Sequence, residues 1–304
     1  MPLHPGYTRC SNLILLQLLT RMKRIPLYII ATTLFAGIFT ACDVIGENDR
    51  YIMETTPEPP TTAVKRVLIE EFTGRKCPNC PTGAQTIADI QAYYEGRVIA
   101  VAIHAGMYAM PTGSAFSDMD FRTEAGNTYN ETYSPQGYPA AMVDRKTFDG
   151  VVASTIRDKW MTSVIAELAE EPIMEIIPTC SYDETSRTAT ITTTIEALQN
   201  MPANLNLQIY LTESGIVAAQ MNGSELIYDY VHNHVLRTAV NGTWGESLTS
   251  LPQGETTTYS HTVTLPAEWN ADNCHIVAFA CEGSGNRVVL QCNECPVIPD
   301  QTLE

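Results

Sequence analysis

Basic residues are scarce in this sequence. Of its 304 residues, 18 are Lys or Arg against 34 Asp or Glu, so the formal net charge at pH 7 is −16. A chain this acidic repels nucleic-acid phosphates and anionic lipid headgroups, so no nucleic-acid partner is expected. The sequence also lacks a phosphate-cradling glycine loop, a nucleotide fingerprint and a Ser-His-Asp order. Disorder is excluded because apolar runs recur along nearly the whole chain, whose length fits two domains plus appendages.

The N-terminal region has the pattern of an export signal. The basic start Met22-Lys-Arg precedes an apolar stretch, Ile25–Ala41, and then Cys42. Residues 1–41 are therefore predicted to be a signal peptide, and the internal Met22 is a candidate for the true start of translation. The stretch Phe39-Thr-Ala-Cys42 resembles the bacterial lipobox, which implies that Cys42 carries the lipid. A transmembrane anchor is the alternative, but the apolar stretch is marginal for spanning a bilayer. We therefore expect membrane contact through the lipid anchor only.

The mature chain is predicted to contain a tether and two domains. Residues 42–63 hold the lipidated Cys and a flexible, Pro- and Thr-rich tether. Over 64–171, buried strands alternate with helical patterns, which predicts an α/β domain. Over 172–304, short strands separated by turn clusters predict an all-β sandwich of immunoglobulin or fibronectin type.

The expected elements can be placed by residue. In the first domain they are strands at Val67–Ile69, Val98–Ile103 and Ala140–Val143, a helix from Pro81 to about Tyr94, an irregular helical insertion over 105–135, and a helix from Val152 to Leu168. In the second they are strands at Ile173–Thr179, Arg187–Leu198, Asn204–Thr212, Ile216–Met221, Thr256–Leu265, Cys274–Cys281 and Arg287–Cys292.

The motif Cys77-Pro-Asn-Cys80 lies between a predicted buried strand and a helix N-terminus. There, unpaired backbone N–H groups and the helix dipole stabilise a thiolate at the first Cys, and Arg75 and Lys76 add positive charge. The second Cys is placed to resolve a mixed disulfide. We favour a redox-active dithiol over two alternatives. One is an inert structural disulfide, and the other is a zinc site shared with a second CxxC, Cys292-Asn-Glu-Cys295. No cofactor or bound metal is predicted.

The segment from Val67 to Cys80 resembles the start of a thioredoxin fold. In that family an acidic residue six positions before the first Cys is buried beneath the active site and assists proton transfer, and Glu71 stands at that offset. The family also has a cis-proline facing the dithiol, and Pro139 in Tyr138-Pro139 is the matching candidate. The resemblance implies catalytic roles for Cys77, Cys80, Glu71 and Pro139.

Several motifs together resemble one family. They are Glu70-Glu-Phe-Thr-Gly74, the CPNC motif, Ile103-His-Ala-Gly106, Gly137-Tyr-Pro139 and His232-Asn-His-Val-Leu-Arg237. The family is the twenty-eight-kilodalton outer-membrane protein family of Bacteroides-type bacteria. The resemblance runs from about Val64 to the C-terminus. It implies an outer-membrane lipoprotein, on the periplasmic or cell-surface face, with a thioredoxin-like domain and a β-sandwich.

Two functions follow from this reading. The first is a thiol–disulfide oxidoreductase whose partners are envelope or surface proteins with thiols or disulfides. The alternative is a non-catalytic surface binding or scaffold lipoprotein in which Cys77–Cys80 is a structural disulfide.

Histidines and the remaining cysteines supply weaker candidates. His232 and His234, at i and i+2, would chelate a metal from one face of a strand, but a polar strand or interface contact is favoured. His104 ends a buried strand near the dithiol, where it would tune the pair or serve structure alone. Pairing Cys281 with Val288 in the C-terminal hairpin would place Cys274 opposite Cys295, which predicts a cross-strand disulfide.

Overall fold

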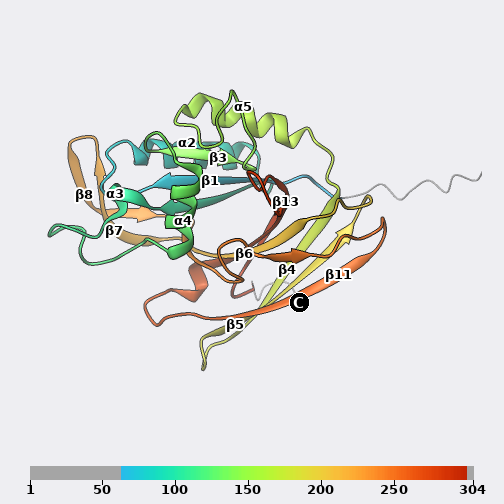
Figure 1. Ribbon diagram of the computed structural model, residues 1–304. Helices are drawn as coiled ribbons and strands as arrows, with labels where there is room; N and C mark the ends of the chain where they lie inside the picture. Colours follow the sequence, from blue (N-terminus) through green and yellow to red (C-terminus); the bar gives the residue numbers. More distant parts are fainter. Residues whose placement is uncertain (1–62, 300–304) are drawn as a thin grey trace, which may run out of the picture. The chain divides into compact units, whose positions relative to one another are not determined.

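The structure is a computed structural model that describes residues 63–299 (Figure 1). The predicted signal peptide, Cys42 and nearly all of the tether lie outside the described residues. In chain order the elements are β1 (Val67–Thr73), α2 (Cys80–Tyr93), β2 (Val98–His104), α3 (Gly106–Ala109), α4 (Glu124–Tyr133), β3 (Ala140–Val143), α5 (Arg157–Leu168), β4 (Met174–Asp183), β5 (Thr188–Ala197), β6 (Leu205–Glu213), β7 (Ile216–Asn222), β8 (Glu225–His232), β9 (Val235–Ala239), β10 (Glu246–Leu248), β11 (Thr256–Thr264), a short 3-10 turn (Ala271–Asn273), β12 (Cys274–Glu282) and β13 (Val289–Pro296).

The fold is mostly β, and its largest sheet has the strand order β13-β12-β6-β9-β2-β1-β3, with β10 paired to β6. β1 is fully enclosed, since all seven of its residues are buried. On one face, alternate residues such as Val67 and Ile69 pack against α2 and α5. On the other, Leu68 and Phe72 pack against α4 and residues of β6 and β12. Burial on both faces explains the continuous apolar run that marks this strand in the sequence.

A second sheet, with the order β11-β5-β4, packs on the β6 and β12 end of the large sheet through a shared apolar core. This arrangement has the two layers of a sandwich. All seven strands predicted beyond Pro172 are present, and β8, β9 and β10 were not predicted. The third sheet is the β7–β8 hairpin: the strand Ile216–Met221 was expected to belong to the sandwich, but β7 pairs with β8 in a separate two-stranded sheet.

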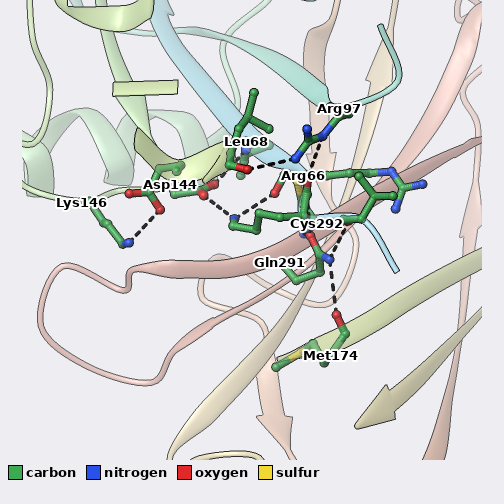
Figure 2. Close-up of polar contacts among 12 residues, drawn as sticks. Arg66, Leu68, Arg97, Asp144, Lys146, Met174, Gln291 and Cys292 are labelled. Carbon is green, nitrogen blue, oxygen red and sulfur yellow. Dashed lines mark hydrogen bonds and ion pairs between the residues drawn. The ribbon is translucent and has the colours of Figure 1, made fainter. Parts of the chain in front are cut away.

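The large sheet contains strands from both segments that the sequence separates at residue 171. β9 pairs in parallel with β2 at Ala102 and Val235, and antiparallel with β6. Gln291 of β13 also links the two segments. It accepts a hydrogen bond at 2.9 Å from the backbone N of Arg66, just before β1, and donates one at 3.3 Å to Met174 O in β4 (Figure 2). The sheet is therefore continuous across this boundary, and the division into two domains stays a prediction.

Helix α5 is shorter than predicted. The apolar stripe indicates a helix from Val152, but the helix begins at Arg157. The preceding residues are extended instead, because Ala141 and Ser154 exchange two backbone hydrogen bonds of 2.9 Å. Within residues 63–299, no helix has the length and apolar character needed to cross a bilayer.

The predicted Cys274–Cys295 disulfide is wrong. Both residues are free thiols, and Cys295 lies opposite Ile276. The register differs from the predicted one because Cys281 pairs with Val289, and an irregularity at Ala280/Cys281 then shifts the ladder by one more residue.

Candidate functional site

The CPNC motif forms a closed disulfide at the start of α2. Cys77 and Cys80 are bonded, with their Cα atoms 5.4 Å apart, and α2 begins at Cys80 with Asn79 at its N-cap. Pro81 occupies the first turn, where a missing N–H costs nothing. Only 1% of Cys77 and 2% of Cys80 is exposed. The two sulfur atoms are therefore bonded to each other, and the closed disulfide is shielded from solvent.

The loop before the disulfide is fixed by a close backbone approach at Gly74. A Cβ at this position would lie 2.7 Å from Ala109 N, so only glycine fits. Lys76 N donates to Tyr108 O at 2.9 Å, which joins the loop to α3. Lys76 also reaches outward, since its Nζ donates to Thr112 Oγ1 at 2.7 Å.

Arg75 was expected to add positive charge near the first thiol, and the structure gives it a structural role as well. Its guanidinium is buried and pairs with Asp118 at 2.9 Å. It also donates to Met119 O at 2.9 Å and to Ala219 O in β7 at 3.0 Å. Arg75 therefore holds together three segments that are distant in the sequence.

Glu71 lies on the face of β1 that packs against α2, in step with Val67 and Ile69. Its side chain is 3% exposed, and Oε1 has no hydrogen-bond partner among the described residues. Desolvation raises the pKa of this carboxyl to about 8, so it is protonated at neutral pH.

Because Gly83 of α2 has no side chain, Glu71 and Pro139 can both pack closely against the first turns of this helix. A Cβ on Gly83 would lie 2.7 Å from Pro139 Cβ and would also collide with the Glu71 carboxyl. The Tyr138–Pro139 peptide bond is cis. The first turns of α2, Glu71 and Pro139 therefore meet beside the disulfide, so the structure brings the four predicted site residues into one region.

The β7–β8 hairpin covers the CPNC loop. Gln220 Nε2 donates to Cys77 O at 3.0 Å, Gly223 N to Pro78 O at 2.8 Å, and Met221 N to Arg75 O at 2.9 Å. This cover was not predicted from the sequence. The turn signal Asn222-Gly223 could have revealed the hairpin itself, but no local signal indicates where the hairpin docks.

A cavity of about 90 Å³ lies beside the disulfide and is lined by Glu71, Cys80, His104, Tyr230 and His232, among others. Three buried polar atoms of these residues have no partner among the described residues: Glu71 Oε1, His104 Nδ1 and His232 Nε2. Desolvation lowers the pKa of His232 to about 4 and that of His104 well below its usual value. At neutral pH the cavity is therefore polar but uncharged at these three groups.

The two histidines proposed as a chelating pair do not share a strand. β8 ends at His232, and His234 has a left-handed backbone with φ of 56°. The i, i+2 geometry of an extended strand is therefore not formed. Within the described part of the chain, no group of three or more His, Cys, Asp or Glu side chains is arranged to hold a metal ion.

Chemically, the site combines a disulfide at a helix N-terminus with a neutral carboxylic acid buried near it. This arrangement suits thiol–disulfide exchange, in which a departing thiolate takes up a proton.

The comparisons with known proteins point to one family. The chain matches the family model described as outer membrane protein Omp28 over residues 126–301, a span that begins after Cys80 and includes Pro139. Among solved structures, HBP35 of Porphyromonas gingivalis is similar at a TM-score of 0.64 and 17% identity, with 79% of each chain covered. A domain of the outer membrane lipoprotein Omp28 from the same organism matches at 24% identity and a TM-score of 0.31, covering 43% of this chain and 92% of that one. No protein with a curated description matches the chain.

Proposed function

The chain belongs to the Omp28 family of outer membrane proteins, and we propose that it exchanges thiols and disulfides with envelope or surface proteins through Cys77 and Cys80. The protein lies at the outer membrane, as its family does. In this proposal a lipid on Cys42 holds it there, with a thioredoxin-like domain over 64–171 and a sandwich over 172–304. The order β1–α2–β2–α3–α4–β3–α5 supports the first domain, and the packing of two sheets supports the second.

One observation carries the proposal: Glu71 is buried beside the disulfide, and its Oε1 has no hydrogen-bond partner among the described residues. Burying a carboxyl group with an unsatisfied oxygen costs free energy, and a disulfide that only cross-links the chain needs no proton donor. Strongly shifted pKa values collect at sites where proton transfer is used. The pKa of about 8 at Glu71 supports a role in exchange rather than in packing.

The reaction is a balanced exchange. A thiolate of a partner dithiol attacks Cys77 Sγ, the Cys77–Cys80 bond breaks, and Cys80 leaves as a thiolate. The Glu71 carboxyl then supplies a proton to Cys80. The second thiol of the partner loses its proton to solvent, attacks the mixed disulfide and releases Cys77 as a thiolate. Cys77 and the Glu71 carboxylate then each take up a proton from solvent. The partner ends as a disulfide and Cys77–Cys80 as a dithiol, and the reverse sequence reduces a partner disulfide.

A second function is favoured by the cover over the disulfide. The β7–β8 hairpin donates two hydrogen bonds to the CPNC motif and a third to Arg75 just before it, and both sulfur-bearing residues are almost fully buried. If this cover is permanent, Cys77–Cys80 is a structural cross-link and the protein is a surface binding or scaffold lipoprotein. Exchange with a protein partner requires the hairpin to move away.

An activity assay separates the two functions. The full mature chain is tested for insulin reduction and for refolding of scrambled ribonuclease, beside Cys77→Ser and Glu71→Gln. Cys292→Ser is the matched control, because it removes a thiol far from the motif in sequence. We expect activity in the wild type and the control, at least a tenfold loss in Cys77→Ser and a smaller loss in Glu71→Gln. Equal rates in the wild type and Cys77→Ser would leave only the second function.

A further inference from the structure

Five cysteines in the described chain are free thiols, and two of them differ from the rest. Cys274, Cys281 and Cys292 are buried, whereas Cys180 and Cys295 are only partly buried. Nothing in the proposed exchange reaction uses these two residues.

The strands that carry them lie side by side at one edge of the sandwich. Gln291 of β13 bonds Met174 O of β4, and two residues further along both strands Asn293 Nδ2 donates to Ile176 O at 2.7 Å (Figure 2 shows the first contact). The two strands therefore advance together in the same direction. The next step of two residues brings Cys295 level with Pro178.

Cys180 follows Pro178 on the inward face of β4. Buried residues at 174, 176 and 178 alternate with exposed residues at 177 and 179, so Cys180 points toward the interior between the sheets. Cys295 belongs to the other sheet and packs against the same apolar core cluster. The two thiols thus face the same interior from opposite layers.

The electrostatics agree with this proximity. Burial raises the pKa of Cys180 to about 11 and that of Cys295 to about 12, and a negative charge on Cys180 contributes to the rise at Cys295. Both thiols are protonated at neutral pH and react slowly without an oxidant.

We propose that Cys180 and Cys295 form a second disulfide, which ties the first strand of the sandwich to the last. Both thiols lose their protons and two electrons pass to an oxidant, a disulfide-bearing thiol oxidase of the envelope. One sulfur–sulfur bond forms and the oxidant's disulfide becomes a dithiol. Exported proteins are exposed to such oxidants, and a cross-link that closes a long loop restricts the unfolded chain strongly.

Peptide mapping tests this pairing directly. The full chain is exported to the envelope of a bacterial host or oxidised with glutathione disulfide, blocked with N-ethylmaleimide in acidic denaturant, and digested with trypsin without reduction. Cleavage after Lys159, Arg187, Arg237 and Arg287 yields the peptides 160–187, which contains only Cys180, 238–287, which contains Cys274 and Cys281, and 288–304, which contains Cys292 and Cys295.

We expect a linked pair of 160–187 and 288–304 in the wild type and in Cys292→Ser, and its loss in Cys295→Ser. A thermal melt should also show a lower midpoint for Cys180→Ser than for the wild type under oxidising conditions, and equal midpoints after reduction of the pair. Recovery of both residues as maleimide adducts, or a link from Cys180 to Cys292, would overturn the proposal. The exchange activity is a separate readout, since both of its cysteines lie in the peptide 77–97.

Discussion

The two neighbouring glutamates of β1 are both buried, yet their surroundings differ completely. Glu70 faces α4, β6 and β12, where Arg145 grips it with hydrogen bonds of 2.6 and 2.7 Å and Tyr210 donates a third at 3.2 Å. Glu71 faces α2 and the cavity, where its Oε1 has no partner among the described residues. The two faces of one strand therefore hold a satisfied polar network and an unsatisfied one.

The surroundings of Glu70 are those of a structural ion pair, whereas those of Glu71 are the ones on which the proposed exchange depends. Arg145 is itself enclosed by the rings of Tyr129 and Phe279, with its Cζ 5.3 and 5.1 Å from their centroids. The buried charges of Glu70 and Arg145 are therefore paired and hydrogen-bonded, as a structural ion pair requires. On the Glu71 side, polar atoms beside the disulfide lack hydrogen-bond partners among the described residues, and perturbed groups of this kind collect at sites of proton transfer.

Breaking the Glu70–Arg145 ion pair should have the largest effect on stability. Arg145→Met leaves the Glu70 carboxylate buried without its partner, so we expect a loss of about 3–5 kcal/mol in the free energy of unfolding. Urea denaturation monitored by circular dichroism measures it. The double variant Glu70→Gln/Arg145→Met is the control, because it removes both charges and should lose clearly less. A loss under 1 kcal/mol in the single variant would contradict the account of this network.

The Glu71 carboxyl should instead make the stability of the fold depend on pH. The folded protein holds the Glu71 proton up to about pH 8, whereas the unfolded chain releases it near 4.5, so stability falls as pH rises between these values. Below pH 6.5 the depressed pKa values of His104 and His232 act in the opposite direction, because the unfolded chain protonates them. The window from about 6.5 to 8 therefore isolates Glu71.

In that window the Glu71 proton accounts for a loss of about 2 kcal/mol in the wild type, at 1.36 kcal/mol per pH unit. Glu71→Gln should lack this loss, so its free energy of unfolding should fall less than that of the wild type between pH 6.5 and pH 8. Urea midpoints at both pH values, wild type beside variant, provide the measurement. Parallel pH dependence in the two proteins would mean that Glu71 is ionised in the folded state.

The hairpin cover should show the smallest effect. Gln220→Ala removes the bond to Cys77 O, worth about 1 kcal/mol, so dithiothreitol should reduce the Cys77–Cys80 disulfide about fivefold faster. Gln199→Ala, an exposed glutamine in the sandwich, is the matched control. An unchanged rate would indicate that Gln220 does not limit access to the disulfide.

Local patterns predicted the elements around the site better than their assembly. The apolar run in β1, Pro81 at the start of α2 and the four residues of β3 each carry a local signal, and all three elements formed there. Glu71 could also be placed on the α2 face from its alternation with Val67 and Ile69.

What could not be predicted depends on contacts between distant segments. The pairing of β9 with β2, which makes one sheet of two segments, rests on a single bridge between residues 133 positions apart in the chain. The docking of Gln220 on the CPNC loop is equally remote in sequence. The register error at Cys274 and Cys295 has two parts, since Cys281 pairs with Val289 rather than Val288 and an irregularity at Ala280/Cys281 shifts the pairings beyond it by one more residue.

The reduction potential of the Cys77–Cys80 pair tests the central claim most directly. The full chain is equilibrated in glutathione redox buffers, or in dithiothreitol buffers at the reducing end, and the peptide 77–97 is quantified as disulfide or dithiol after alkylation. An exchange-active pair should titrate between about −270 and −120 mV, the range of known thiol–disulfide oxidoreductases. A value below about −300 mV, typical of structural disulfides, would contradict the proposed exchange and leave a covered cross-link beneath the β7–β8 hairpin.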